Sequence, residues 1–206
     1  MVLDGLDDVP WSELTHAYGK ATDVPALIRS LVSADKAERE HALHELFGNI
    51  WHQGTVYRAT IYALPFLVDL LRDPHTPDRD ALALLVASIV AGRGYTEIHW
   101  SRPIVSPFTG RPLAKPSDLD DRIAKERDVV QEIRKRGAAA VDILLPFLDH
   151  GEVDVRMTVA EALGCFPSRA DTIVPLLRTA LADEHDVQAR KAMEDSLNAL
   201  APGDPA

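Results

Sequence analysis

The sequence predicts an all-α protein in which about four helical pairs stack into one right-handed α–α superhelix spanning residues 1–206. Several segments place apolar residues at i, i+3, i+4 and i+7, the spacing of a helix with one buried face, as in Leu64, Leu67, Val68 and Leu71. A short apolar motif containing proline recurs at Pro25, Pro65, Pro146 and Pro175. The first two prolines lie 40 residues apart, the length of a two-helix repeat. No segment alternates like a series of strands.

Composition limits the classes of function. The hydrophobic fraction is 46%, no apolar run is long enough to span a membrane, and a single cysteine allows no intrachain disulfide. The acidic N-terminus does not resemble a secretion signal, so we expect a cytoplasmic protein. The net charge of −10 repels phosphate backbones, which disfavours nucleic acid and favours a basic protein as the partner.

Along the chain, a short helix is expected around residues 11–18, where it would cap the first pair. Pro25 and Pro175 are expected near helix starts, because the first amides of a helix have no intrahelical acceptor and proline lacks that donor. Pro65 and Pro146 follow longer helix-compatible runs, so each is expected to kink the first helix of its pair.

The repeat pattern breaks first at residues 48–58, after the helix that carries Leu43 and Leu46. This turn is rich in aromatic and hydrogen-bonding side chains, and Trp, Tyr and Arg are favoured where proteins bind one another. The candidate partner-binding residues here are Asn49, Trp51, His52, Gln53, Tyr57 and Arg58. The alternative is structural: the aromatic rings would pack between repeats while His52 and Gln53 cap helices.

The second break is a proline-rich basic insertion, residues 93–117, which is expected to be a loop. It holds four prolines, and four basic residues against one acidic residue give it a net charge of +3. Loops longer than about 12–15 residues are usually functional or disordered. Its candidate binding residues are Tyr95, Trp100, Arg102 and Arg111. Alternatively, the basic loop folds back over the acidic scaffold.

Helical spacing continues through the third and fourth pairs, with stripes such as Val155, Val159 and Leu163. The run 154–164, with 145–148 before it and more weakly 174–200 after it, resembles HEAT repeats of the phycobilisome-lyase type. The resemblance implies a polar ladder between repeats, formed by Asp154, Arg156, Asp186 and Arg190, with Arg39 and Arg79 in comparable places. Residues 48–57 resemble small bacterial HEAT-repeat proteins, and some HEAT-like proteins are immunity partners of toxins.

Residues capable of chemistry are few. His41 and His44 lie one helical turn apart and His52 is near in sequence, a spacing that metal-binding helices use. The iron-binding HEAT-like deoxyhypusine hydroxylases repeat His-Glu pairs, whereas this chain has only His44-Glu45. A solvated helix face explains these residues better than a metal site, and Cys165 is expected to be structural.

The sequence therefore predicts a non-catalytic protein-binding scaffold without cofactor or metal, and more narrowly an immunity-type inhibitor of a basic toxin. A metal-dependent or lyase-like enzyme, or a small-ligand binder, centred on the histidines is the alternative. A HEAT-like DNA glycosylase or other nucleic-acid binder is more remote, because the charge balance opposes it.

Overall fold

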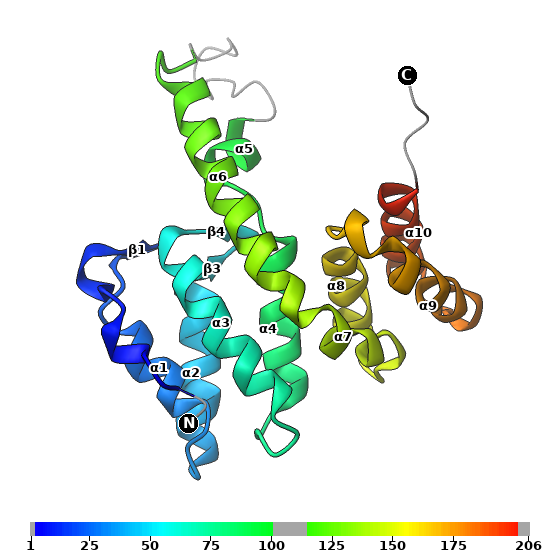
Figure 1. Ribbon diagram of the computed structural model, residues 1–206, viewed down its shortest axis with the longest axis horizontal. Coiled ribbons are helices and arrows are strands. Elements are labelled where there is room, and N and C mark those ends of the chain that lie inside the picture. The colour runs from blue at the N-terminus through cyan, green and yellow to red at the C-terminus, as the bar shows by residue number, and fades with distance from the viewer. Residues whose placement is uncertain (1–2, 101–114, 202–206) are drawn as a thin grey trace, which may run out of the picture.

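The helices of the computed structural model follow one another as four pairs, and residues 3–100 and 115–201 are described (Figure 1). The first helices of the pairs are α1 (Val24–Ser30), α3 (Arg58–Arg72), α6 (Leu119–Gly137) continued by α7 (Val141–Leu144), and α9 (Ala170–Asp183). The second helices are α2 (Lys36–Asn49), α4 (Arg79–Ala91), α8 (Val153–Leu163) and α10 (Val187–Leu200). The predicted all-α stack of about four pairs is confirmed.

The second helices form the continuous part of the core, because α2, α4, α8 and α10 contact one another in that order. The central helix α4 is apolar on nearly every side, with Leu82, Leu85, Val86 and Ile89 all buried. A helix of this kind is stable only when neighbours cover it all round. Here α2, α3, α6 and α8 do so.

A ladder of arginines ties the helical pairs together near the starts of the second helices. Arg39 donates to the carbonyl oxygens of the preceding loop and to Asp78 at the start of α4. Arg156 likewise donates to the loop before α8 and, through two bonds, to Glu184 between α9 and α10. Each arginine therefore closes its own loop and holds the next pair in place.

The acidic members of this ladder differ from those that the family resemblance implied. Asp186 accepts from the amides of Gln188 and Ala189 and so caps its own helix, α10. Asp154 lies exposed in the first turn of α8. The acidic residues that bridge pairs are Asp78 and Glu184. Each comes from the loop just before a second helix, where Asp78 meets Arg39 and Glu184 meets Arg156.

The prediction of an N-terminal helix at residues 11–18 is wrong. A 3₁₀ turn at Trp11–Glu13 is followed by a hairpin of β1 (Thr15–His16) and β2 (Gly19–Lys20). Leu14, in the middle of the expected helix, has extended backbone, with φ −90° and ψ 157°.

The prolines only partly follow expectation. Pro25 lies in the first turn of α1, and Pro146 falls where α7 gives way to a 3₁₀ helix, so the first helix of the third pair is broken as predicted. Pro65 lies inside α3. The placement of Pro175 at a helix start is wrong, because α9 begins five residues earlier, at Ala170.

The insertion is not a loop throughout. It opens with helix α5 (Tyr95–Trp100), since its first proline comes only at residue 103. Glu126 of α6 holds the start of α5 by accepting from the amide and the hydroxyl of Thr96, at 2.8 and 2.7 Å. In Figure 1, α5 and the first half of α6 project together beyond the stack. None of the helices in the two described ranges has the length and apolar character needed to cross a bilayer.

Candidate functional site

The two breaks in the repeat pattern meet in space. Strands β3 (Trp51–His52) and β4 (Thr55–Val56) form a hairpin after α2, and its turn residues Gln53 and Gly54 both have positive φ, +50° and +87°. This is the backbone of a two-residue hairpin turn that matches the twist of its strands. Arg93, which follows α4, donates its amide to the Gly54 carbonyl at 2.9 Å and accepts from the Val56 amide at 3.1 Å. The backbone thus fixes the base of the insertion to the hairpin.

Beside this junction, one face of the second helices is hollowed. A first hollow of about 470 Å³ is lined by α2, α4 and α8. Its apolar side chains, all partly exposed, are Phe47, Trp51, Leu84 and Met157. The rings of Phe47 and Trp51 meet edge to face, with centroids 5.8 Å apart. Two carboxylates, Asp154 and Glu161, lie on the same lining.

A second hollow, of about 550 Å³, adjoins the first and shares Gly54, Ala91 and Glu161 with it. It continues to α10 and carries more charge. Its polar and ionisable lining residues are Arg93, Arg134, Glu161, Cys165, Asp195 and Ser196. We call the surface made by the two hollows, together with Trp51 and Arg93 at its edge, the hollowed face.

The ionisable groups of the hollowed face perturb one another. Glu161 reaches solvent, yet partial burial of its carboxyl raises its pKa, with Arg93 acting in the opposite direction. Burial also raises the pKa of the Cys165 thiol, and the charges of Arg134 and Arg93 only partly oppose this. Cys165 is therefore held as the neutral thiol, which is the weaker nucleophile.

The predicted residues of the 48–58 turn take different roles. Trp51 lines the first hollow, while Gln53 and Arg58 are exposed. His52 is half-buried, with Nδ1 3.0 Å from the Gly48 carbonyl oxygen. Tyr57 precedes α3 and its hydroxyl lies 2.6 Å from the Thr55 hydroxyl, and burial raises its pKa.

Asn49 is buried inside the chain. It is 2% exposed, and its side chain donates to Asp23 and accepts from the Ile50 amide. Since Asp23 also bonds His16, this network ties the first hairpin to the end of α2. Asn49, a candidate partner-binding residue in the sequence, is thus used in contacts within the chain.

In the insertion, Tyr95 is 53% exposed and lies against His99, with ring centroids 4.2 Å apart. Trp100 is half-buried at the end of α5. Arg102 and Arg111 lie outside the described residues.

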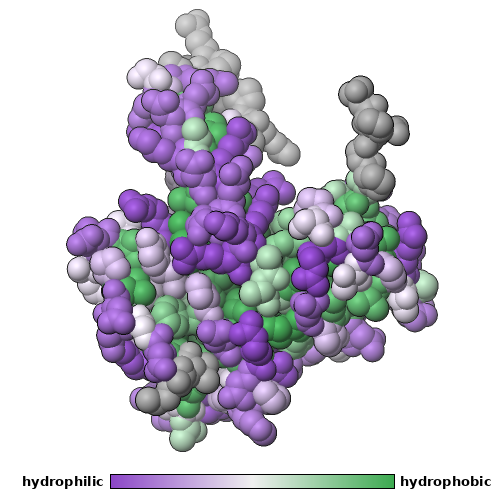
Figure 2. Space-filling view, viewed as in Figure 1, coloured by the Kyte–Doolittle hydropathy of each residue, from purple (hydrophilic) through white to green (hydrophobic). Residues whose placement is uncertain are grey.

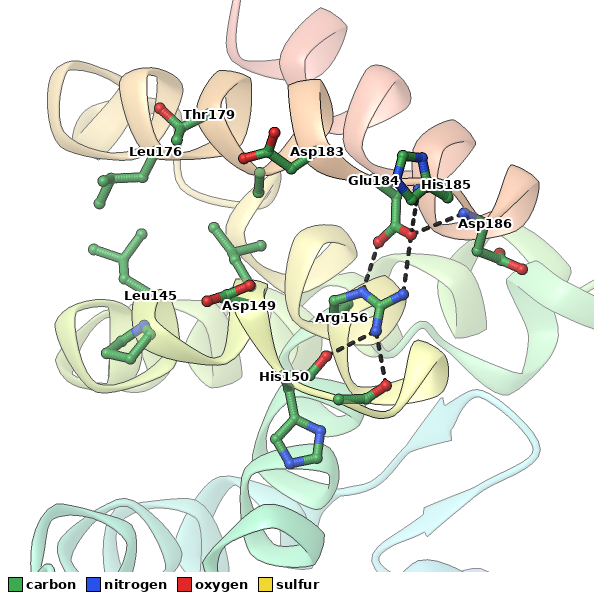
Figure 3. A pocket seen from close by; sticks show the side chains of 14 residues that line it. Leu145, Asp149, His150, Arg156, Leu176, Thr179, Asp183, Glu184, His185 and Asp186 are labelled. Carbon is green, nitrogen blue, oxygen red and sulfur yellow. Dashed lines mark hydrogen bonds and ion pairs between the residues drawn. The ribbon is translucent and has the colours of Figure 1, made fainter.

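A different groove, of about 700 Å³, lies between the 3₁₀ helix Leu145–Asp149 and α9 (Figure 3). Figure 2 shows apolar residues gathered on the surface over α7, α8 and α9, whereas the projecting arm is mostly hydrophilic. At one end of the groove Leu145 faces Leu176; at the other lie Arg156 and Glu184, bonded to each other. The charged end of this groove therefore serves the ladder between pairs.

The histidines of the alternative hypothesis are not gathered into a metal centre. Within residues 3–100 and 115–201, no three His, Cys, Asp or Glu side chains are grouped closely enough to hold an ion. His41 and His44 are both exposed on α2.

Residues of the hollowed face that the sequence did not single out are Arg134, Met157, Glu161 and Asp195. Each lies in a run with ordinary helical spacing, so no local signal separates it from its solvated neighbours. In the sequence, Arg93 was counted only as one of the basic residues of the insertion.

No protein-family model matches the chain, and no curated protein matches it. Among solved structures, an engineered protein, target OR329 of the Northeast Structural Genomics Consortium, aligns with a TM-score of 0.40 and 18% identity over 87% of this chain and 80% of its own. The designed armadillo repeat protein YIII(Dq)4CqI aligns with a TM-score of 0.26 and 17% identity over 86% of this chain and 99% of its own. At such scores and identities, neither structure informs the function of this chain.

Proposed function

We propose that this chain is a non-catalytic scaffold that binds another protein on its hollowed face. The observation that carries the proposal is the first hollow. It lies over three successive second helices, and Phe47 of α2, Trp51 of β3 and Met157 of α8 are partly exposed in it together. Large apolar side chains in one depression, rimmed by polar groups, are typical of protein-binding surfaces.

The charge of this surface favours a basic partner. Asp154 and Glu161 flank the apolar residues, and the whole chain carries a net charge of −10. A partner that inserts an apolar side chain beside Lys or Arg would satisfy both features, and its association would be accelerated by the opposite charge. An immunity-type inhibitor of a basic toxin, built on HEAT-like repeats and acting in the cytoplasm, is the specific role that we propose.

The first test uses Trp51→Ala, with Tyr18→Ala as the matched control. Tyr18 is also aromatic, but it is 73% exposed and lies outside both hollows. A partner captured from the native host and then purified is expected to bind Trp51→Ala about 10- to 30-fold more weakly, as measured by calorimetry. Tyr18→Ala should bind within about twofold of the wild type, and affinity should fall as salt is added. Equal binding by both variants would refute the hollowed face as the binding surface.

The narrower role is tested by producing this chain together with the product of the adjacent gene. Protection of the cells and a stable complex are expected, and both should be weakened by Trp51→Ala. Neither complex nor protection would refute the immunity role while leaving the scaffold proposal to the first test.

A further inference from the structure

Two arginines in the second hollow have no partner of their own. Arg93 follows α4 and Arg134 lies in the last turn of α6. Within the described residues, neither side chain makes a hydrogen bond or an ion pair, and the Nε of Arg134 is buried without any acceptor. Arg136, two residues further on, instead donates to Glu132 and to the carbonyl of Ile61. A buried donor without an acceptor is destabilising. Arg134 therefore lines the hollow without the hydrogen bonds that Arg136 finds within the chain, and its guanidinium group is not neutralised by a carboxylate of the described residues.

The space around these arginines is suited to a small molecule. The second hollow, of about 550 Å³, adjoins a smaller one of about 280 Å³, and Arg93 and Arg134 line both. Small-molecule sites usually measure about 300–1,000 Å³. The lining of the second hollow also includes the apolar residues Ala91, Ile98 and Ala199.

The same hollow also holds an anion without a partner. The carboxylate of Glu161 makes no side-chain hydrogen bond or ion pair among the described residues, and burial raises its pKa. Asp195 lies nearby but is bonded to Lys191 at 2.7 Å. Arg93 and Arg134 belong to the part of the lining shared with the smaller hollow, whereas Glu161 belongs to the part shared with the first hollow. The charge of Arg93 acts on Glu161 without an ion pair between them, so unpaired positive and negative groups line the same hollow.

We propose that this cavity binds a small amino acid, whose carboxylate is held by Arg93 and Arg134 and whose ammonium group is held by Glu161. A guanidinium group matches the planar fork of a carboxylate and satisfies it with two donors. A phosphate or a dicarboxylate would satisfy the arginines but would place extra negative charge against Glu161 and Asp195. This site lies in the second hollow and shares Glu161 with the first hollow, which carries the proposed protein partner. Binding of small amino acids is measured without the protein partner, so each proposal can fail alone.

Calorimetry with the purified chain tests the assignment, using amino acids whose two charged groups are separated by one to five carbon atoms, together with succinate and inorganic phosphate. We expect one separation to bind best, and Arg93→Gln or Arg134→Gln to weaken it about 10-fold or more. Glu161→Gln should weaken the amino acid and shift the preference toward succinate. Arg178→Gln, on the exposed side of α9, is the matched control and should change nothing.

A second measurement needs no variant. Cys165 is the only cysteine of the chain and lines the cavity, so a bound amino acid should slow its alkylation. Absence of both binding and protection across the series would overturn the proposal. Tighter binding of phosphate or succinate than of every amino acid, or unchanged binding by a folded Arg134→Gln variant, would overturn it as well.

Discussion

At the scale of single residues, Arg156 and Glu184 form a buried polar contact between the third and fourth helical pairs. The guanidinium group donates twice to the carboxylate, at 2.6 and 2.9 Å, and also to the carbonyls of His150 and Gly151. The Glu184 side chain is only 4% exposed. Because both partners are removed from water, loss of either one leaves a charge that water cannot readily solvate.

We therefore predict that Glu184→Gln lowers the free energy of unfolding by about 2–3 kcal/mol, measured by urea denaturation at neutral pH. The control is Glu194→Gln, whose ion pair with Arg190 is exposed and 3.8 Å long. Such a pair contributes about 0.5 kcal/mol or less. Equal effects of the two substitutions would show that the Arg156 pair does not stabilise the stack.

The same pair predicts how stability depends on pH. Hydrogen bonding to Arg156 lowers the pKa of Glu184 from its ordinary 4.5 to about 2. A lowered pKa means that the stabilising contribution is complete above the unfolded-state value and is lost as the pH falls toward the folded-state value. The difference in stability between wild type and Glu184→Gln should thus be constant above about pH 5 and shrink between about pH 4.5 and pH 2. A difference that is unchanged at low pH would contradict this.

At the scale of elements, close approach of α8 and α10 depends on a residue without a side chain. A Cβ atom on Gly164 would lie 2.7 Å from the Ser196 hydroxyl and 3.1 Å from its Cα. Ser196 itself donates to the Ala160 carbonyl at 2.8 Å, which fixes its position between the two helices. The contact that joins the last two pairs therefore has no room for a methyl group.

Gly164→Ala is predicted to cost about 1–3 kcal/mol of stability, since the helices must separate to admit the new atom. Gly48→Ala is the control. Gly48 lies in the last turn of α2, as Gly164 directly follows α8, but a Cβ on Gly48 would meet no atom within 4 Å. That change should be neutral or stabilise the protein by up to about 1 kcal/mol, as glycine is the weaker helix former. Thermal unfolding of the two variants side by side distinguishes close packing from a general effect of alanine.

At the scale of the whole molecule, each helical pair completes its core only against its neighbours. Val159 and Leu163 of α8 are fully buried in a core that also includes Ile173 of α9 and Met193 of α10. In stacked repeats of this kind, stability is shared between each unit and its interfaces. The terminal pair is therefore part of the support of the pair before it.

A chain ending at residue 168, which lacks α9 and α10, is expected to lose at least about 3 kcal/mol, because burial of each large apolar side chain contributes about 1.5–3 kcal/mol. It should also bind a hydrophobic dye more strongly. A chain ending at residue 201 removes no described helix and should unfold like the wild type. Full stability of the shorter chain would show that the third pair does not depend on the fourth.

The sequence by itself determined the helical content, the four-pair stack and the places where the repeat is interrupted. Helical spacing of Leu64, Leu67 and Leu71 is a local signal, because residues on one face of a helix recur every three or four positions. The sequence also drew attention to Trp51, which lines the first hollow. The helical periodicity stops after residue 48, and this is visible without knowing which helices pack beside the turn. The N-terminal hairpin was missed because its geometry depends on a turn of only a few residues.

Only the tertiary structure decided which side chains face the hollows. Arg134 and Arg136 stand two positions apart in the same turn and look alike in sequence, yet one faces the cavity without a partner and the other bonds α3. Asn49 and Trp51 are also two positions apart, yet Asn49 is buried and Trp51 lines the hollowed face. Successive helical residues point about 100° apart, and each wall of the cavity comes from a different helix. The site is therefore a property of how the helices are stacked, which no single segment of the chain encodes.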